Sequence, residues 1–482
     1  MNENSDSKKN KPGSGEAALR SGFWYVISNV LIRAVGIITA PIYTRLLTTA
    51  ETGYANNFNN YVSIFSVICG LCLIYSVGRA KLDFKDKFDG YMSAIQFLSS
   101  AFSLIILILV MIFFPADGML LKFPRLVIFI LFFYLMLFPS IDYMQYKYRF
   151  EYKYRENIAI SIIITAATVI LTVSLLLFAP GEKGFLKILG TVIPSGAAAV
   201  WCYVNLARKG RVFINKEYWL YALKIGLPMI PHGLALILLS RIDVSMISSY
   251  YGFSEVGLYT SGYTIGTLLM FITNAVGQAW LPYFNERLYE GDTEVIREKN
   301  KILMFYGCVL TLVFIAAAPL AVKLLFAKSY WESMWVVPPV ALGTLCQYFY
   351  TNYVNAELFH KKTFLIALNS CIAAAVNIGL NAFFIPRYGY IAAAYTTLAG
   401  YFILMVLHYI AVRFVLKMKL YHDALYFLML IGTCTAGILT AFLYPYPLFR
   451  YPLILAVMAV LAILRKDDII IVVNMLNRKI LR

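Results

Sequence analysis

The chain has 482 residues, of which 61% are hydrophobic and only 14% are charged, and its formal net charge is +17. Soluble globular domains carry about 25% charged residues and are roughly half apolar, so this composition excludes an ordinary soluble domain. A charge this basic would suggest nucleic acid in a soluble chain, but membrane proteins gather basic residues in short loops, so nucleic acid is not an expected partner.

Apolar runs bounded by charged or turn residues follow one another along the whole chain. About 20 apolar residues cross a bilayer as a helix, so each run is a candidate transmembrane helix. The pattern predicts an all-α polytopic membrane protein with about 14 transmembrane helices. The expected spans are 23–47, 55–78, 92–114, 126–145, 157–178, 185–206, 219–248, 256–282, 302–324, 334–357, 363–385, 389–414, 424–443 and 451–464.

Both ends of the chain are expected on the cytoplasmic side. Residues 1–20 are polar and lysine-rich, which predicts a disordered cytoplasmic tail without a signal peptide, and residues 466–482 predict a second cytoplasmic tail. Most lysines and arginines lie in alternate loops, on the same side as the two tails. The positive-inside rule then predicts a multi-pass protein of the cytoplasmic (plasma) membrane.

The sequence lacks the usual marks of an enzyme. The outer loops are too short for a catalytic domain, and no Gly-x4-Gly-Lys phosphate loop is present. The seven cysteines lie mostly inside apolar runs and have no metal-ligand spacing. We therefore expect no catalytic residues, no metal and no cofactor.

The stretch from Lys224 to Gly266 predicts a long, broken helix. Pro228 and Pro231 remove backbone donors from an apolar helical run, so its first turns should be kinked or unwound. Such breaks survive at membrane depth only where protein or a water-filled cavity covers them. Pro41, Pro228 and Pro231 are the hinge candidates.

Two short stretches that share Glu-x-Gly lie 204 residues apart, between the first and second spans and between the seventh and eighth. Both are expected to form the turns of outer hairpins. Because six spans separate them, they favour a parallel repeat of two lobes. Two unrelated hairpins that each use glycine for a turn are the alternative. The stretches are Glu51–Tyr54 and Glu255–Leu258.

Ionisable side chains within spans are candidate binding groups, because burying them in lipid is costly. The first span carries a stripe of polar and small residues around Arg33 that suits a wet cavity, and structural pairing with a carboxylate or a carbonyl is the alternative. The spans hold more cations than carboxylates, which favours an anionic cargo such as pyrophosphate. For cations near span ends, anchoring at the interface is the alternative. The cavity candidates are Asn29, Arg33, Arg45, Lys187, Lys224 and Arg241.

Three titratable residues are candidates for ion coupling. His232 and Asp243 are 11 residues apart, so they return to nearly the same face of a helix. Glu357 lies near the inner end of its span. A proton or sodium gradient is the candidate driving force. A structural histidine and hydrated helix ends are the alternatives for these positions.

Several stretches resemble the Wzx-type oligosaccharidyl-lipid flippases of the multidrug/oligosaccharidyl-lipid/polysaccharide exporter superfamily, over about residues 20–415. The resemblance implies a lobe at 21–210 and a lobe at 217–415, each of six helices, around a central cavity. The pair at 420–465 resembles the extra helices of the related peptidoglycan-precursor flippases. The matching stretches are Tyr43–Leu46, Gly53–Tyr54, Gly78–Arg79, Gly226–Pro228 with Pro231, Asp243 with Glu255–Tyr259 and Tyr263, and Trp280–Pro282.

The resemblance implies a flippase that carries polyprenyl-pyrophosphate-linked oligosaccharide repeat units from the inner to the outer leaflet by alternating access. Its expected partners are this lipid-linked cargo, the lipid bilayer, and a polysaccharide polymerase with other assembly proteins. A cation-coupled multidrug exporter of the same superfamily is the first alternative. A membrane-embedded polymerase or ligase is the second, and the short outer loops disfavour it.

Overall fold

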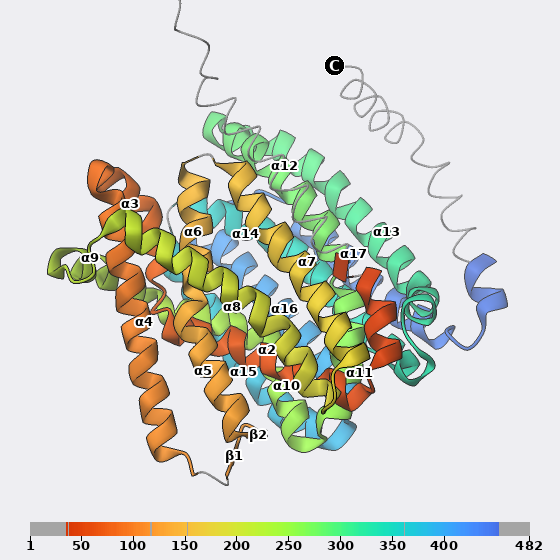
Figure 1. Cartoon of the computed structure of the whole chain (residues 1–482). Helices are drawn as coiled ribbons and strands as arrows, with labels where there is room; N and C mark the ends of the chain where they lie inside the picture. Colours follow the sequence, from red (N-terminus) through yellow and green to blue (C-terminus); the bar gives the residue numbers. More distant parts are fainter. Residues whose placement is uncertain (1–34, 37, 116–117, 152, 361, 453–482) are drawn as a thin grey trace, which may run out of the picture. The chain divides into compact units, whose positions relative to one another are not determined.

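The computed structural model describes residues 35–36, 38–115, 118–151, 153–360 and 362–452, and these are nearly all helical (Figure 1). One two-stranded antiparallel hairpin interrupts them. The elements of the first half are α2 (Thr49–Cys69), η1 (Leu73–Ser76), α3 (Val77–Asp83), η2 (Lys85–Lys87), α4 (Phe88–Phe113), β1 (Met119–Leu120), β2 (Phe123–Pro124), α5 (Arg125–Leu137), α6 (Pro139–Phe150), α7 (Tyr154–Phe178) and α8 (Lys183–Gly210). Those of the second half are α9 (Lys216–Gly226), η3 (Leu227–Met229), α10 (Ile230–Tyr250), α11 (Phe253–Gly266), α12 (Leu269–Glu290), α13 (Thr293–Leu325), η4 (Lys328–Trp335), α14 (Val337–Phe359), α15 (Thr363–Tyr388), α16 (Tyr390–Ile410), η5 (Ala411–Val415) and α17 (Asp423–Phe442).

The described residues contain 10 helices that are long and apolar enough to cross a membrane, or up to 11 if the bent pair α2 and η1–α3 counts as one span. The expected span 334–357 is the helix α14, which is not among them. The expected span 23–47 lies partly, and 451–464 almost entirely, outside the described residues. The multi-pass helical fold is therefore confirmed, and the count of 14 stays a prediction.

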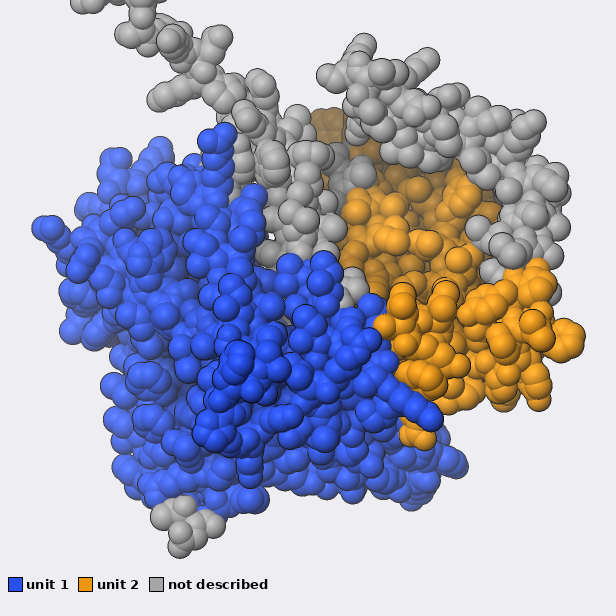
Figure 2. Space-filling model, turned by 45° about the vertical axis from the view of Figure 1, so that its right-hand side comes forward, with its two compact units in different colours: residues 1–261, 325–330, 362–404 blue, residues 262–324, 331–361, 405–482 orange. Residues whose placement is uncertain are grey.

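The chain forms two compact units (Figure 2). Unit 1 comprises residues 1–261, 325–330 and 362–404, and unit 2 comprises residues 262–324, 331–361 and 405–482. Unit 1 thus holds α9, α10, α15 and most of α16 together with the predicted first lobe. These units follow packing rather than the expected lobe boundary near residue 215, and the assignment of two lobes stays a prediction.

The two Glu-x-Gly stretches form the first turns of helices rather than the turns of hairpins. Thr48 caps α2: its hydroxyl accepts a hydrogen bond from the Glu51 N–H at 3.2 Å, and the Glu51 carboxylate accepts one from the Thr48 N–H at 2.8 Å. The second stretch lies in α11, which starts after Gly252 at φ +103°. The expectation of turns was wrong by a few residues, because Glu51 serves a capping box.

Besides the junction of α5 and α6 at Phe138, unit 1 has two further helix breaks. The break expected at Pro228 and Pro231 is present: α9 ends at Gly226, and the short 3-10 turn η3 joins it to α10. A second break, after Cys69, interrupts the expected span 55–78, where α2 and the following helix meet at 54°. There Leu71 and Cys72 have φ values of +50° and +51°, and the sequence has no proline near this break.

The hairpin β1–β2 rests on the end of α10. Leu121 and Lys122 form its two-residue turn, both with positive φ as a type I′ turn requires. The Lys122 ammonium donates to the backbone carbonyls of Ser248 and Ser249, at 3.1 Å for the latter. A cation at these last carbonyls of α10 complements the helix dipole and stabilises the docked hairpin.

Lys122→Met should loosen this hairpin without disturbing the helices. Loss of the charged contact costs about 1 kcal/mol. We therefore expect amide hydrogens of residues 119–124 to exchange about fivefold faster in hydrogen–deuterium exchange of the full chain in nanodiscs. Lys209→Met, at an exposed position of α8, is the matched control. Equal protection of the hairpin in both variants would show that Lys122 does not hold it.

Candidate functional site

Three irregular helix segments of unit 1 border one cavity of about 270 Å³. The first is the break after α2, the second is the junction of α5 and α6 at Phe138 and Pro139, and the third is the start of α10 around Gly233. Backbone groups freed at a helix break need water or protein partners, so breaks gather where a membrane protein encloses a polar space. The sequence signalled one of these breaks, and packing brings all three together.

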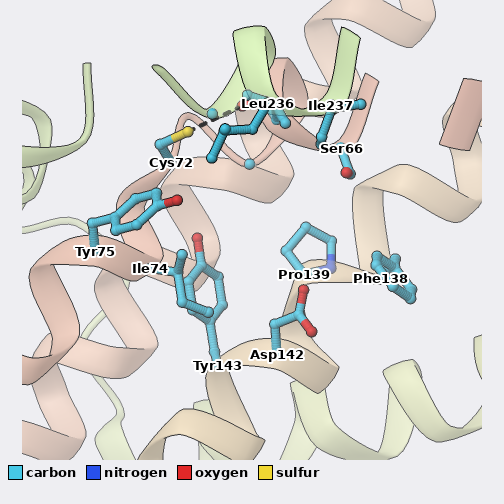
Figure 3. A pocket seen from close by; sticks show the side chains of 13 residues that line it. Ser66, Cys72, Ile74, Tyr75, Phe138, Pro139, Asp142, Tyr143, Leu236 and Ile237 are labelled. Carbon is cyan, nitrogen blue, oxygen red and sulfur yellow. Dashed lines mark hydrogen bonds between the residues drawn. The ribbon is translucent and has the colours of Figure 1, made fainter. Parts of the chain in front are cut away.

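Polar side chains project into this cavity. Figure 3 shows the Asp142 carboxylate and the hydroxyls of Tyr75 and Tyr143 pointing into the space between α6 and α10. Asp142 is half-buried, and it has no hydrogen bond or ion pair within 4 Å among the described residues, while Arg149 attracts its charge from farther away. No lysine or arginine is among the described lining residues. This part of the site can therefore hold a cation or a hydroxyl-rich group.

The two broken helices contact each other at their breaks. A Cβ atom on Gly226 would lie 2.6 Å from the Leu71 carbonyl oxygen, and Gly233 faces the Cys72 sulfur and Val67. Only a residue without a side chain allows the end of α9 to approach the α2 break this closely. The breaks therefore form one shared joint beside the cavity.

A second contact joins α2 to α11, and we call it the glycine contact. It consists of Thr49, Gly53 and Asn56 on α2 with Ser254, Gly257 and Thr260 on α11. A Cβ on Gly53 would lie 1.7 Å from the Phe253 carbonyl oxygen, and a Cβ on Gly257 would lie 2.0 Å from the Thr49 carbonyl oxygen. Each repeated glycine thus packs against the partner helix backbone, so the two stretches that resemble each other in sequence meet reciprocally.

Single polar bonds hold the glycine contact. The Thr49 and Ser254 hydroxyls are 2.8 Å apart, and the Asn56 amide donates to the Thr260 hydroxyl at 2.7 Å. Along α2 and α10, Asn57 and Asn60 donate to serine hydroxyls at 3.2 and 2.8 Å. Their amide oxygens are buried without a hydrogen-bond partner among the described residues. Buried orphan acceptors cost stability, so α2 is held here less tightly than fully satisfied amides would hold it.

Another polar contact joins α3 to α9, the shorter parts of the two broken helices, and we call it the tyrosine contact. The Tyr221 hydroxyl of α9 donates to the Asp83 carboxylate of α3 at 2.7 Å, and Arg79 donates to the same carboxylate at 3.1 Å. Both hydrogen bonds, first that of Tyr221, hold the pKa of the Asp83 carboxyl below its usual value. This contact therefore persists until acidic pH protonates Asp83.

A buried carboxylate lies in the wall formed by α10, α11 and α16. Asp243 is 1% exposed and accepts hydrogen bonds from the Tyr259 hydroxyl, from the Val244 N–H at 2.8 Å and from the Thr397 hydroxyl at 3.3 Å. All three donors are neutral, and among the described residues no cation forms an ion pair with Asp243 within 4 Å, while Arg241 attracts its charge from farther away. An uncompensated buried charge attracts a proton or a small cation.

Amide side chains continue this polar wall across α15 and α16. The Asn377 amide donates to the Thr396 carbonyl at 3.0 Å, and the Asn381 amide donates to the Asn377 amide oxygen at 3.1 Å. The Thr396 hydroxyl donates to the Asn381 amide oxygen. Thr396 and Thr397 are neighbours on α16, so one helix links these amides to the Asp243 carboxylate. Oxygen groups of this kind can solvate a hard cation.

None of the predicted cations that the structure describes lines the cavity. Asn29 and Arg33 lie outside the described residues. Arg45, Lys224 and Arg241 are exposed, and the Lys187 ammonium lies 5.7 Å from the centre of the Tyr43 ring. Arg241 and Asp243 face different ways, as two positions on a helix must. The role of these six residues in binding cargo stays a prediction.

Glu357, another predicted coupling residue, has a side-chain partner of its own. Glu357 of α14 is fully buried in unit 2, where His408 Nδ1 of α16 lies 3.0 Å from both of its carboxylate oxygens. Glu357 therefore has an imidazole partner, whereas the hydrogen-bond partners of Asp243 are all neutral. The His232 side chain lies outside the described part of the chain. Pro41 lies in helical backbone, and its role as a hinge stays a prediction.

Sequence reasoning missed the amides of α15 and the second helix break. Asn377 and Asn381 are one helical turn apart in an apolar run, and this spacing was a usable signal. The break at Leu71 and Cys72 had only Gly70 as a signal, because non-glycine residues rarely adopt positive φ. Asp142, near the inner end of the expected span 126–145, lies in the cavity wall.

Residues 18–288, more than half of the chain, match the family model described as "Polysaccharide biosynthesis protein". No curated protein sequence matches the chain.

Solved structures of transporters share the fold. The lipid II flippase MurJ, in an inward closed conformation, superposes with a TM-score of 0.69 at 12% identity, over 94% of this chain and 100% of MurJ. An inward-facing MATE-family multidrug resistance transporter of the MOP superfamily gives 0.57 at 14% identity, over 81% of this chain and 98% of that one. A MOP superfamily transporter from Pyrococcus furiosus gives 0.53 at 14% identity, over 84% and 96%.

Proposed function

This chain belongs to the polysaccharide biosynthesis protein family, and we propose that it is a flippase for polyprenyl-pyrophosphate-linked oligosaccharides. In this proposal it carries one repeat unit from the inner to the outer leaflet of the cytoplasmic membrane, for surface polysaccharide assembly, and both termini are cytoplasmic. It acts by alternating access and performs no covalent chemistry. The lipid-linked cargo, the bilayer and a polysaccharide polymerase with other assembly proteins are its partners.

The glycine contact is the observation that carries alternating access. Two related stretches, 204 residues apart in the sequence, meet through small residues and single hydrogen bonds with orphaned amide oxygens beside them. Opening this interface breaks few hydrogen bonds and separates Phe253 of α11 from Tyr54 of α2, whose ring centres are 5.1 Å apart. The predicted topology places it at the outer face. The tyrosine contact is then its inner counterpart, and transport requires the two to open in turn.

We assign ion coupling to Asp243. Its carboxylate is buried among neutral donors, so a proton or a sodium ion that binds there relieves an uncompensated charge. The same carboxylate receives hydrogen bonds from α11 and α16, so its occupancy can change how these helices pack on α10. A proton or sodium gradient is the proposed energy source.

A cation-coupled drug exporter is the second candidate, and the Asp142 cavity favours it. A carboxylate without a described lysine or arginine beside it suits an organic cation better than a diphosphate. The predicted cations Arg33, Arg45 and Lys187 favour the anionic cargo instead.

Transport by the full chain in proteoliposomes separates the two candidates. The probes are a fluorescent farnesyl-diphosphate-linked N-acetylglucosamine, followed by dithionite quenching of the outer leaflet, and the cationic dye ethidium. We expect the glycolipid to change leaflets and ethidium to stay, with glycolipid transport reduced by Arg33→Gln. If ethidium moves while the glycolipid does not, the exporter replaces the flippase.

A further inference from the structure

Unit 2 contains a polar pocket between α12 and α14 that none of the predicted site residues lines. Its volume is about 170 Å³, room for on the order of ten water molecules. This is space for one sugar ring rather than for a whole repeat unit. We call it the amide pocket. It is lined by Asn274 and Trp280 of α12 and by Gln347, Thr351 and Asn355 of α14, among others.

The α14 side of the amide pocket is one helical stripe. Gln347, Thr351 and Asn355 are four residues apart, so their side chains stand one above the other on the same face. An amide, a hydroxyl and an amide in this order form a ladder that can both donate and accept hydrogen bonds. Vicinal sugar hydroxyls need this combination of donors and acceptors.

Several polar groups of the amide pocket have no protein partner. Asn355 is 8% exposed, and its amide makes no hydrogen bond among the described residues. The Trp280 indole N–H is buried without a hydrogen-bond partner in the same set. Asn274 is exposed and likewise makes no side-chain hydrogen bond there. Buried amides normally find partners, so these groups point to a ligand that supplies them.

The chemistry of the lining selects the class of ligand. No charged side chain is among the described residues that line the amide pocket, so a diphosphate would be desolvated there without compensation from them. Neutral hydroxyls lose much less on entering, and the Trp280 ring offers an apolar surface to the C–H face of a sugar. The adjoining cavity of about 340 Å³ shares Thr273 and Tyr348 but is otherwise mostly aliphatic. Amides therefore concentrate in one of two neighbouring cavities.

We propose that the amide pocket binds one neutral sugar residue of the cargo, through the amides of Asn274, Gln347 and Asn355, with Trp280 against the sugar ring. This inference rests on the proposed flippase function and adds to it a site that binds the sugar rather than the diphosphate. Affinity for the glycan and affinity for the pyrophosphate then depend on different residues.

Binding to the full chain in nanodiscs tests this assignment. The probes are farnesyl diphosphate and its conjugates with glucose, galactose or N-acetylglucosamine. We expect at least one conjugate to bind the unmodified chain more tightly than farnesyl diphosphate does. Asn355→Leu and Asn274→Leu should each weaken that conjugate about tenfold and leave farnesyl diphosphate unchanged. Asn205→Leu on α8 is the matched control and should change neither affinity.

Asn274 is exposed and makes no hydrogen bond in the described structure, so its substitution tests the pocket even if Asn355→Leu lowers the melting temperature. The assignment fails if no conjugate binds more tightly than farnesyl diphosphate, or if Asn274→Leu leaves the preference unchanged or weakens all probes equally. If the glycolipid still changes leaflets in proteoliposomes while these affinities are unaltered, the assignment of the amide pocket is rejected and the flippase function is retained. Loss of glycolipid transport in the unmodified chain would reject the flippase itself.

Discussion

Oxidation of the double variant Thr49→Cys with Ser254→Cys is expected to stop transport, and reduction is expected to restore it. The two hydroxyl oxygens are 2.8 Å apart, so sulfur atoms at these positions can close to the 2.05 Å of a disulfide with little backbone movement. A covalent bond across the glycine contact prevents α2 and α11 from separating. If alternating access requires this separation, glycolipid transport in proteoliposomes falls to background on oxidation.

Each single cysteine variant is the control for the double variant. Neither can form the bridge, so both should transport equally with and without oxidant. The unmodified chain, whose seven cysteines include five buried ones, controls for oxidation elsewhere. If the fully oxidised double variant still transports, the glycine contact stays closed throughout the cycle. Alternating access would then require other helices to separate.

Asp243→Asn is expected to uncouple transport from the ion gradient while leaving the fold intact. Asparagine keeps the shape and the acceptor oxygen for Tyr259 and Thr397, but it carries no charge to attract a proton or sodium ion. We expect the stimulation of glycolipid transport by an imposed proton or sodium gradient to fall about tenfold, the effect of about 1.4 kcal/mol. Imposing each gradient separately identifies the ion.

Glu357→Gln is the matched control, because Glu357 is an equally buried carboxylate that has an imidazole partner. Removing its charge leaves His408 without an ionised acceptor, so the variant should lose stability, by about 1–3 kcal/mol, and keep its response to the gradient. If stimulation by the gradient survives in Asp243→Asn and disappears in Glu357→Gln, the coupling residue is Glu357 instead of Asp243.

Local sequence signals explain which site features were predictable. The proline pair at positions 228 and 231 predicted a break because proline lacks a backbone donor wherever it occurs, and the structure has that break. The break at Leu71 and Cys72 depends on contacts with Gly226, which lies far away in the sequence, so no local pattern revealed it. The spacing of Asn377 and Asn381 indicates one shared helix face, but their partner Thr396 lies on another helix, so the sequence did not reveal their contact.

The sequence by itself determined that this protein is a multi-pass helical membrane protein with a broken seventh span and a repeated Glu-x-Gly stretch, because hydropathy and proline act within a few turns of one helix. Only the tertiary structure decided that the two repeated glycines contact each other's helices, that three breaks share one cavity, and that Asp243 is buried among neutral donors. These features join segments up to about 200 residues apart, and packing between helices sets such distances while local propensity does not.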